Sequence, residues 1–277
     1  MLQLNTPPSL EHRFGFGANW RDYLKGLREE HVAHSVAALQ DMLGRDSLKG
    51  MTFLDVGSGS GLSSLAAWRL GATVRSFDFD PESVEATRYT RERFADGDGD
   101  RWSVEQGDAL APDYMAGLGT FDIVYSWGVL HHTGGMWRGI ANTLERVAPE
   151  GQLFLAIYND QGRASKQWWA VKKVYNTLPP VLRFLVLWPA FLRLWGPTAA
   201  VDLVRGRGLS RWRDYGRQRG MSPWHDVVDW VGGWPFEVAK PEEIFDACRR
   251  HGFALERLTT CRGGLGCNEF VFRKESK

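Results

Sequence analysis

The sequence predicts an α/β fold in which a seven-stranded, mostly parallel sheet carries helices on both faces and a helical cap insertion. Three observations predict it. Short apolar runs alternate with helix-like stretches from residue 51 to 158, a glycine-rich turn follows the first run, and a basic, apolar stretch at 159–238 interrupts the pattern before it closes. With 277 residues, 43% of them hydrophobic, the chain can bury a sizeable core.

Five apolar runs have the length and composition of β-strands, and we expect them to form the parallel part of the sheet. They read MTFLDV, ATVRSFDF, RWSVEQ, FDIVYSW and GQLFLAIY. Helices are expected between them at 62–70, 81–94 and 136–147, with Pro81 suited to a first helical turn. Repeated strand and helix order buries both faces of such a sheet.

The ends of the chain complete the organisation. A helix is expected at 241–250, followed by strands at 254–260 and 269–272 that the stretch CRGGLGCN joins into an antiparallel pair. The chain then divides into an N-terminal helical lid (1–50), a core (51–158), a cap insertion (159–238) and a closing helix with the terminal strands (239–277). The helical segment at 20–43 either covers a ligand cleft or packs on the core.

A glycine-rich loop, FLDVGSGSG, joins the first strand to its helix. Gly57, Gly59 and Gly61, with Ser58 between them, let the backbone approach a ligand at the carboxyl edge of the sheet. A dinucleotide fingerprint would place its third glycine where Leu62 stands. Asp55 would repel a pyrophosphate and attract an ammonium group. The loop therefore favours a ligand with a positive end and no phosphates.

Carboxylates follow the next two strands. Asp78 and Phe79 end the second run, and Asp78 lies 21 residues beyond Gly57, a spacing at which an acid can bind ribose hydroxyls. Asp80 is the rival, although its place before Pro81 also suits a helix cap. In GDAL, after the third run, Asp108 can accept a hydrogen bond from an adenine amine while Ala109 offers a backbone donor.

Together, FLDVGSGSG, SFDFD, QGDAL and FDIVYSWGVLHHT resemble the class I S-adenosylmethionine (SAM)-dependent methyltransferases, in particular their ubiquinone/menaquinone-type small-molecule branch. The resemblance covers roughly residues 50 to 157. It implies a Rossmann-like fold, SAM as the cofactor and a small-molecule acceptor. It also implies that Asp55 and the loop 57–61 face the methionine part, Asp78 the ribose and Asp108 the adenine, and that Ser126 and Trp127 line the methyl-transfer pocket.

Residues near the expected transfer site are candidates for the remaining chemistry. His131 and His132 follow the fourth strand, and either could act as the general base if the acceptor loses a proton. The alternative is that this histidine pair only shapes the pocket. Candidates for acceptor contacts, which could equally be a polar loop and a packed helix, are Tyr158, Asn159, His225 and Glu237.

The cap insertion is strongly basic. Residues 161–220 hold 12 Lys/Arg and two acids, a net charge of +10, whereas the other 22 Lys/Arg and 31 Asp/Glu give the rest of the chain −9. Within it, LPPVLRFLVLWPAFLRLWGP is apolar, but Pro189, Arg183 and Arg193 interrupt it, which disfavours a transmembrane helix.

Three interpretations of this apolar segment stay open: a cap over a hydrophobic, quinone-like or lipid-like acceptor, an interfacial element on an anionic membrane, and a buried hairpin or dimer contact. In the second, headgroup contacts would come from Arg205, Arg207, Arg211, Arg213, Arg217 and Arg219. No recognised RNA-binding module accompanies these arginines, so nucleic acid is a disfavoured partner.

The cysteines and the N-terminal sequence indicate the expected cellular location of the protein. Cys248, Cys261 and Cys267 are too few for a disulfide framework and lack zinc-site spacing, so we expect no metal. No stretch near the N-terminus has the order of a signal peptide. We expect a cytoplasmic protein, in the interfacial interpretation peripheral to the inner face of a membrane.

Two functions remain after these exclusions. The first is a SAM-dependent methyltransferase with a small-molecule acceptor. The second is a SAM-binding protein, or a SAM-using enzyme, that transfers no methyl group. A nicotinamide oxidoreductase is disfavoured by the G-x-G-x-G spacing, Asp55 and Leu62.

Overall fold

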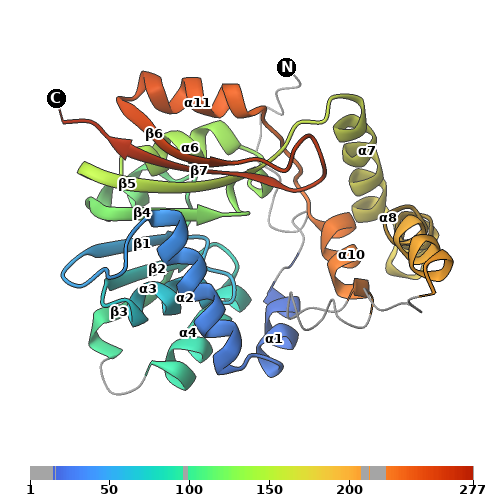
Figure 1. The fold of residues 1–277 in the computed structure, drawn as a ribbon, viewed down its shortest axis with the longest axis horizontal. Coiled ribbons are helices and arrows are strands. Elements are labelled where there is room, and N and C mark those ends of the chain that lie inside the picture. Colours follow the sequence, from blue (N-terminus) through green and yellow to red (C-terminus); the bar gives the residue numbers. More distant parts are fainter. Residues whose placement is uncertain (1–14, 16, 96–98, 207–211, 213–222, 277) are drawn as a thin grey trace.

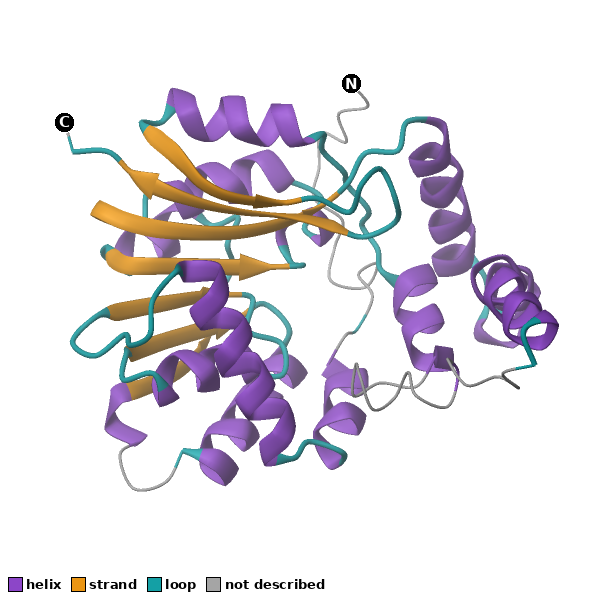
Figure 2. Cartoon of the chain, in the orientation of Figure 1, coloured by secondary structure: helices purple, strands orange, loops and turns teal. Residues whose placement is uncertain are grey.

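The computed structural model of the chain describes residues 15, 17–95, 99–206, 212 and 223–276. Its centre is a seven-stranded sheet in the order β3-β2-β1-β4-β5-β7-β6 (Figures 1 and 2). The strands are β1 (Thr52–Val56), β2 (Thr73–Asp78), β3 (Trp102–Gln106), β4 (Phe121–Trp127), β5 (Val147–Tyr158), β6 (Phe253–Thr259) and β7 (Cys267–Lys274). Strands β1 to β5 are parallel, and β7 pairs antiparallel with both β5 and β6. The predicted mostly parallel sheet with an antiparallel terminal pair is confirmed.

Helices cover both faces of the sheet, as predicted. One face packs against α2 (Glu29–Leu43) and α3 (Leu62–Arg69), with α4 (Pro81–Phe94) beside them. The other face packs against α5 (Pro112–Gly117), α6 (Met136–Leu144) and α11 (Pro241–Arg250). The sequence interpretation had no helix at α5, whose six residues are too few to show helical periodicity.

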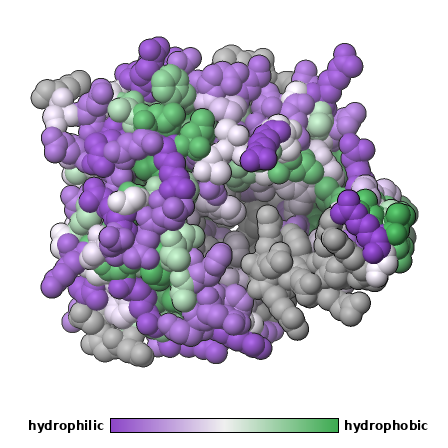
Figure 3. Space-filling model, viewed as in Figure 1, coloured by the Kyte–Doolittle hydropathy of each residue, from purple (hydrophilic) through white to green (hydrophobic). Residues whose placement is uncertain are grey.

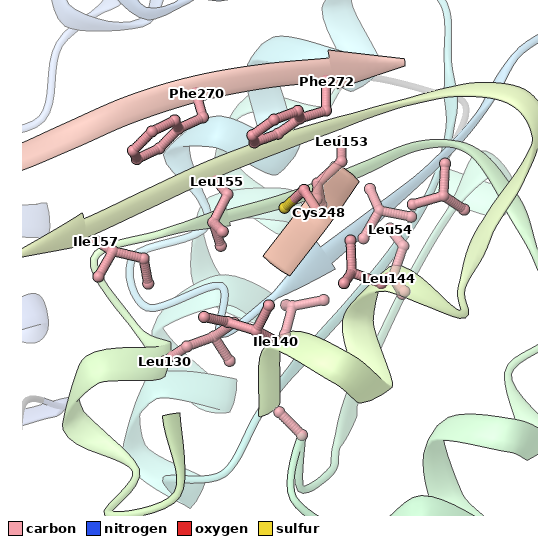
Figure 4. Close-up of a cluster of buried hydrophobic side chains, with 14 of the residues drawn as sticks. Leu54, Leu130, Ile140, Leu144, Leu153, Leu155, Ile157, Cys248, Phe270 and Phe272 are labelled. Atoms are coloured by element: carbon pink, nitrogen blue, oxygen red, sulfur yellow. The ribbon is translucent and has the colours of Figure 1, made fainter. Parts of the chain in front are cut away.

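Side chains that alternate along each strand pack into the helical layers on the two faces of the sheet. Phe53 of β1 packs into the layer of α2 and α3, and its neighbour Leu54 packs into the opposite layer. Phe270 and Phe272 of β7 both point into the layer of α6 and α11, where they lie near Cys248 (Figure 4). The two-residue period therefore fixes which face each strand side chain occupies.

The N-terminal segment forms two helices rather than the single helical stretch expected at 20–43. Helix α1 (Gly17–Lys25) is separated from α2 by a short turn. Leu24 and Leu27 are buried there against Ala86 of α4. The backbone N–H of Gly17 also donates to Asp80 Oδ2 at 3.0 Å. Helix α1 is thus attached to the loop that follows β2.

The insertion forms a helical cap beyond the edge of the sheet at which β4 ends (Figure 1). Its described elements are α7 (Arg163–Thr177), the 3-10 turn η4 (Pro180–Leu182), α8 (Phe184–Val204) and α10 (Pro223–Gly232). A further 3-10 turn, η3 (Leu130–His132), follows β4 in the core. The cap has its own apolar cluster, in which Trp168, Tyr175, Leu187, Val227 and Val231 are buried.

Helix α8 corrects one prediction. It runs without a break through Pro189 and Pro197, so the expectation that Pro189 interrupts the segment is wrong. A proline removes one backbone hydrogen bond, and the flanking turns of a 21-residue helix keep the others. By length and composition, Pro180–Val204 is apolar enough to cross a membrane, which also overturns the exclusion based on that interruption.

Candidate functional site

Backbone hydrogen bonds join three loops at the carboxyl ends of β1, β2 and β3. The N–H groups of Gly57 and Ser58 both donate to the carbonyl oxygen of Phe77, at 2.9 and 3.0 Å. The N–H of Gly107 donates to the carbonyl of Asp78 at 2.9 Å. These bonds bring together the glycine loop, the end of β2 and the GDAL segment, which the sequence predicted to share a site.

The glycine loop needs glycine at two positions for reasons of space as well as conformation. Gly57 has φ +84°, and a Cβ there would lie 2.3 Å from a methyl group of Val129. Gly59 has φ +53°, and its Cβ would lie 3.1 Å from the indole of Trp20. Both values of φ are in the left-handed region, which side chains disfavour. The loop therefore presents bare backbone between Val129 on one side and Trp20 on the other.

Ser58 is held by the neighbouring helix α4. Its hydroxyl lies 2.8 Å from the hydroxyl of Thr87, and the side chain is buried. The Thr87 hydroxyl also donates to the Gly59 carbonyl at 3.1 Å. The loop conformation is therefore fixed from behind by α4.

Asp78 ends β2 against this loop. Its Oδ2 accepts from the Gly59 N–H at 2.9 Å, and its Oδ1 accepts from the Asp80 N–H at 3.0 Å. Burial raises the pKa of Asp78 to about 6, although the hydrogen bonds from Gly59 and Asp80 oppose that rise. Each oxygen has a second lone pair, so the carboxylate can accept hydroxyl donors above the loop.

Asp80, the rival to Asp78, is the N-cap of α4. Its side chain accepts from the Glu82 N–H at 3.0 Å, the capping bond that its position before Pro81 suggested. Phe79 lies between the two acids and is half-buried, and its carbonyl accepts from Gln106 Nε2 at 3.1 Å. The geometry therefore separates the two acids: Asp80 holds a helix and α1, while Asp78 faces the glycine loop.

Asp55 is buried beneath the loop. Its Oδ2 accepts from the Ser64 hydroxyl of α3 at 2.5 Å, and Ser64 in turn contacts the Ser76 hydroxyl at 2.6 Å. Burial, with a smaller contribution from the charge of Asp78, raises the pKa of Asp55 to about 7. Asp55 is 2% exposed, so its observed contact is with the protein, and it fixes the start of α3.

The GDAL segment makes a tight turn. Asp108 Oδ1 accepts from the Leu110 N–H at 2.8 Å, which leaves the half-buried carboxylate at the start of the loop after β3. The Ala109 carbonyl accepts from Asn142 Nδ2 at 2.8 Å. The hydrogen bond from the Gly107 N–H to the Asp78 carbonyl therefore places Asp108 and Ala109, which follow Gly107, near the end of β2.

The end of β4 places two predicted residues on opposite faces of the sheet. Ser126 is buried, and its hydroxyl donates to the Val56 carbonyl at 3.2 Å. Trp127 is exposed at 48%, and its indole N–H donates to Glu269 Oε1 at 2.8 Å. With Tyr125 and Ser63, Trp127 lines a pocket of about 130 Å³ beside α2. Trp127 thus borders a pocket next to the first turn of α3, whereas Ser126 joins β4 to β1.

His131 is buried and His132 half-buried in η3, beside the cap. The Tyr158 N–H donates to His131 Nδ1 at 3.3 Å, and the two rings stack with centroids 3.8 Å apart. His132 Nδ1 lies 2.7 Å from the Pro235 carbonyl, to which it donates as a protonated nitrogen. Burial lowers the pKa of His131 well below its usual value and that of His132 to about 3.

These low pKa values make both imidazoles weak proton acceptors near neutral pH. Their contacts instead join the loop after β4 to β5 and to the segment that follows α10. His131 Nε2 has no hydrogen-bond partner within the described part of the chain. With Nδ1 accepting, the neutral ring carries its proton on Nε2, which is a fully buried donor.

Three of the four predicted acceptor residues have described side chains, and these make different contacts. Tyr158 lies within an aromatic cluster with Trp230 and Phe236 of the cap. Glu237 accepts from the Met136 N–H at the start of α6, at 3.0 and 3.2 Å, and burial raises its pKa to about 7. Asn159 bonds to Gly264 of the β6–β7 connection and to Asn268 of β7.

His225 lies in α10, and its side chain is outside the described part of the structure. Among the other three, the contacts of Glu237 and Asn159 hold loops together. The half-buried Tyr158 is the one that lies between the sheet edge and the cap.

Two residues of this region were not identified from the sequence. Trp20 was taken only as the start of a helical segment, although its indole covers Gly59. Lys172 of α7 is fully buried, with its ammonium 4.3 Å from the Trp230 ring centroid and 4.7 Å from that of Phe236. It donates to the Trp230 carbonyl, and burial lowers its pKa to about 7. A lysine in a basic helix gives no sequence signal of burial.

Comparison with known proteins identifies the region that contains these loops. Residues 54–153 match the family described as a methyltransferase domain. The chain is 35% identical over 137 residues to the ubiquinone biosynthesis O-methyltransferase of Xanthomonas campestris pv. campestris (strain B100), covering 49% of this chain and 51% of that protein. It is 30% identical over 157 residues to the tRNA U34 carboxymethyltransferase of Methylococcus capsulatus, covering 56% and 43%. The chain therefore spans about half the length of the curated relatives it matches.

The fold is similar to that of solved methyltransferases. The magnesium protoporphyrin IX methyltransferase of Synechocystis PCC 6803, crystallised with bound SAH, aligns with 91% of this chain and 86% of its own at a TM-score of 0.52. The sequence identity is 15%. This similarity confirms the predicted Rossmann-like sheet with its helical layers.

Proposed function

Because residues 54–153 form a methyltransferase domain on a class I, Rossmann-like fold, we propose that the protein transfers a methyl group from SAM to a small-molecule acceptor. The observation that carries the proposal is the joining of the glycine loop to Asp78. The loop exposes backbone at Gly57 and Gly59, and the Asp78 carboxylate accepts from the Gly59 N–H itself.

The residues present fit SAM better than a phosphate-bearing cofactor. Asp78 would hold the ribose hydroxyls and Asp108 the adenine, while Gly57, Gly59 and Gly61 would lie along the methionine part. The buried Asp55 lies under the loop and the half-buried Asp78 beside it, and the negative charge of Asp78 above pH 6 would repel a pyrophosphate there. For Asp55 the Ser64 contact supports a role in shaping the loop that faces the methionine part.

When bound, SAM supplies an electrophilic methyl group on a positively charged sulfur. The protein then has to align the acceptor and keep water out, since the displacement needs no covalent link to the enzyme. Trp20 covers the glycine loop, and Tyr158, Trp230 and Phe236 form an apolar wall at the edge of the cap. These side chains would exclude water from the site.

An acceptor such as a hydroxyl or phenol must also lose a proton when it is methylated. The lowered pKa values make His131 and His132 poor bases, and their contacts with Tyr158 and Pro235 hold the loop after β4 in place. We therefore assign His131 and His132 to positioning and expect acceptors that ionise readily, such as phenols or other acidic groups, to be preferred.

The acceptor is proposed to be small and apolar. One relative is named for ubiquinone biosynthesis, and one structural neighbour is named for magnesium protoporphyrin IX. The aromatic residues of the cap support a similar acceptor here, because a site lined by tryptophan and phenylalanine favours an apolar ligand. Such acceptors partition into membranes, so we place the enzyme in the cytoplasm, at or near the inner face of a membrane.

Calorimetric titration of the purified protein with SAM, SAH and NAD tests the cofactor assignment. We expect micromolar binding of SAM and SAH and no heat from NAD. Binding of NAD without binding of SAM would overturn the proposal. Incubation of the protein with radiolabelled SAM and a panel of phenolic quinone precursors then tests transfer. SAM binding with no labelled product from any acceptor would favour a SAM-binding protein that transfers no methyl group.

A further inference from the structure

The outer side of the cap carries a continuous row of exposed apolar side chains. Five of them follow the spacing of one helical face, at Val181 (76% exposed), Phe184 (52%), Leu185 (56%), Trp188 (53%) and Leu192 (62%). The row lies on η4 and α8, and in Figure 3 hydrophobic residues gather at the margin of the molecule over α8. Only 6% of the most apolar window of this segment is buried.

The opposite side of α8 is covered by the protein itself. Leu187 and Ala190 are buried in the cap cluster, and Phe191 packs against Trp224 of α10 with ring centroids 5.7 Å apart. Helix α8 is therefore apolar on both sides, with one side docked on the cap and the other facing outward. An exposed apolar row of this length normally marks an interaction surface.

The charges from residue 161 to 201, the stretch that contains the row, are all of one sign, and the next residue, Asp202, is a buried acid of α8. From residue 161 to 201 the chain has six Lys/Arg and no Asp or Glu. Arg193 is exposed one residue beyond Leu192, and Lys173 is exposed on α7. Arg183 lies over the Tyr175 ring at 5.2 Å. Apolar and aromatic side chains bordered by cations are the pattern that recognises an anionic lipid surface.

A pocket beside the row points to the same partner. It has a volume of about 300 Å³ and lies along the second half of α8, lined among others by Phe191, Leu192, Trp195 and Trp212. Its apolar walls suit a hydrocarbon chain. Leu192 belongs both to the row and to the pocket, so the pocket adjoins the surface that would meet the lipid.

Two other ways of covering the row fit less well. A second copy paired about a two-fold axis would bring the same cations face to face, with no acid between residues 161 and 201 to pair with them. A spanning helix would need lipid on every side, whereas Leu187, Ala190 and Phe191 are packed against the cap.

We propose that η4 and α8 dock the protein on an anionic lipid bilayer, with the helix lying in the interface and its outer row in the acyl region. Docking would place the cap at the source of an apolar acceptor, and in that respect it extends the proposed function. The docking itself needs no catalysis, so its failure is distinguishable from failure of the methyl-transfer assignment.

Vesicle flotation tests the proposal on the full chain. Vesicles of phosphatidylcholine alone are compared with vesicles containing phosphatidylglycerol. We expect the protein to float with the anionic vesicles and to bind the neutral ones more weakly. Leu185→Glu/Leu192→Glu should weaken flotation by about tenfold or more, because two apolar side chains that enter the acyl region become charged.

Leu258→Glu/Leu265→Glu is the matched control, since these leucines are 41% and 42% exposed on β6 and on the β6–β7 connection. This variant should float like the unmodified protein. Equal SAH affinity in all three proteins shows that the variants are folded and keeps this test separate from the cofactor assignment.

Three results would overturn the proposal. The first is no flotation with either vesicle, and the second is unchanged flotation of Leu185→Glu/Leu192→Glu. The third is retention on vesicles after an alkaline carbonate wash, which would indicate a spanning helix instead. Sedimentation showing a dimer that Leu185→Glu/Leu192→Glu dissociates would assign the row to a second copy of the chain.

Discussion

Among single residues, Asp78 is expected to contribute a measurable part of the cofactor affinity. Asp78→Ala removes a carboxylate that would accept from the ribose, and hydrogen bonds to charged groups contribute about 1.5–3 kcal/mol. We therefore expect SAH affinity to fall by roughly ten- to a hundredfold. Isothermal calorimetry measures it, with the exposed Asp113→Ala of α5 as control. Unchanged affinity in Asp78→Ala would remove this residue from the site.

The same carboxyl predicts how cofactor binding depends on pH. The pKa of Asp78 is raised to about 6, so the carboxylate predominates above pH 6 and is protonated below it. SAH binding should therefore weaken as pH falls from 8 to 5, by at most about tenfold per unit for one proton. Asp78→Asn should lose the component near pH 6. An identical pH profile in wild type and Asp78→Asn would assign the dependence to another group.

Lys172 predicts that stability also rises with pH, but in a higher pH range. Its folded pKa of about 7 lies below the usual lysine value of 10.5, so the unfolded chain binds more protons between those values. Stability of the wild type therefore rises with pH across that window. Lys172→Met should be more stable at pH 7, by about 1–2 kcal/mol, and this gain should shrink towards pH 10.

Urea unfolding at both pH values measures this effect, and Lys173→Met, at the exposed neighbouring position, is the control. A loss of stability in Lys172→Met at pH 7 would mean that the aromatic contacts of the ammonium outweigh its desolvation.

Side-chain partners limit how much of the site the sequence can predict. Asp78 and Asp80 could be ranked, because a carboxylate immediately before a proline has an obvious capping role. The burial of His131 and His132 could not, because it depends on Pro235 and Tyr158, which are distant in sequence. The contact of Glu237 with Met136 spans 101 residues and carries no local signal either.

At the scale of elements, the glycine loop combines a backbone requirement with a packing requirement. Gly57→Ala should cost about 1 kcal/mol for the left-handed conformation and about 1–3 kcal/mol more for overpacking against Val129. SAH affinity should fall with it. Gly44→Ala, at φ +64° with open space around its Cβ, should show the conformational cost alone. Equal destabilisation of the two variants, measured by urea unfolding, would contradict the role of Val129.

Elements with strong periodicity were predictable, and those that depend on their surroundings were not. Helix α4 begins and ends at Pro81 and Phe94 as expected, because a cap and a proline fix its start. Helix α8 was expected to break at Pro189, yet it continues, because proline tolerance depends on neighbouring turns and packing. The turn between α1 and α2 was missed because α1 packs on α4 rather than beside α2.

At the scale of the whole molecule, charge is divided between two parts. Residues 161–220 carry +10 and the remainder −9, so an anionic surface would attract the cap and repel the sheet. Many of these cations, among them Arg207, Arg211, Arg213, Arg217 and Arg219, lie outside the described residues. The order of strands was predictable because βα repeats allow few topologies, whereas the cap has no repeat from which to infer its packing.

The charge division predicts a salt dependence. Vesicle flotation should weaken several-fold between about 50 and 500 mM salt, because the Debye length falls well below the size of the cap. Residual binding at high salt should then depend on Leu185 and Leu192. Flotation that does not respond to salt would show that the cations contribute nothing to docking.

Helix α1 has a kinetic consequence for this arrangement. Trp20 rests on Gly59, and Gly17 donates to Asp80, so α1 lies against the loop proposed to hold the cofactor. Under the proposed function, we expect this helix to move away from the loop when spent methyl donor is exchanged for fresh. The rate of turnover would then depend on how tightly Trp20 and the Gly17 hydrogen bond hold α1 in place, rather than on the methyl-transfer step.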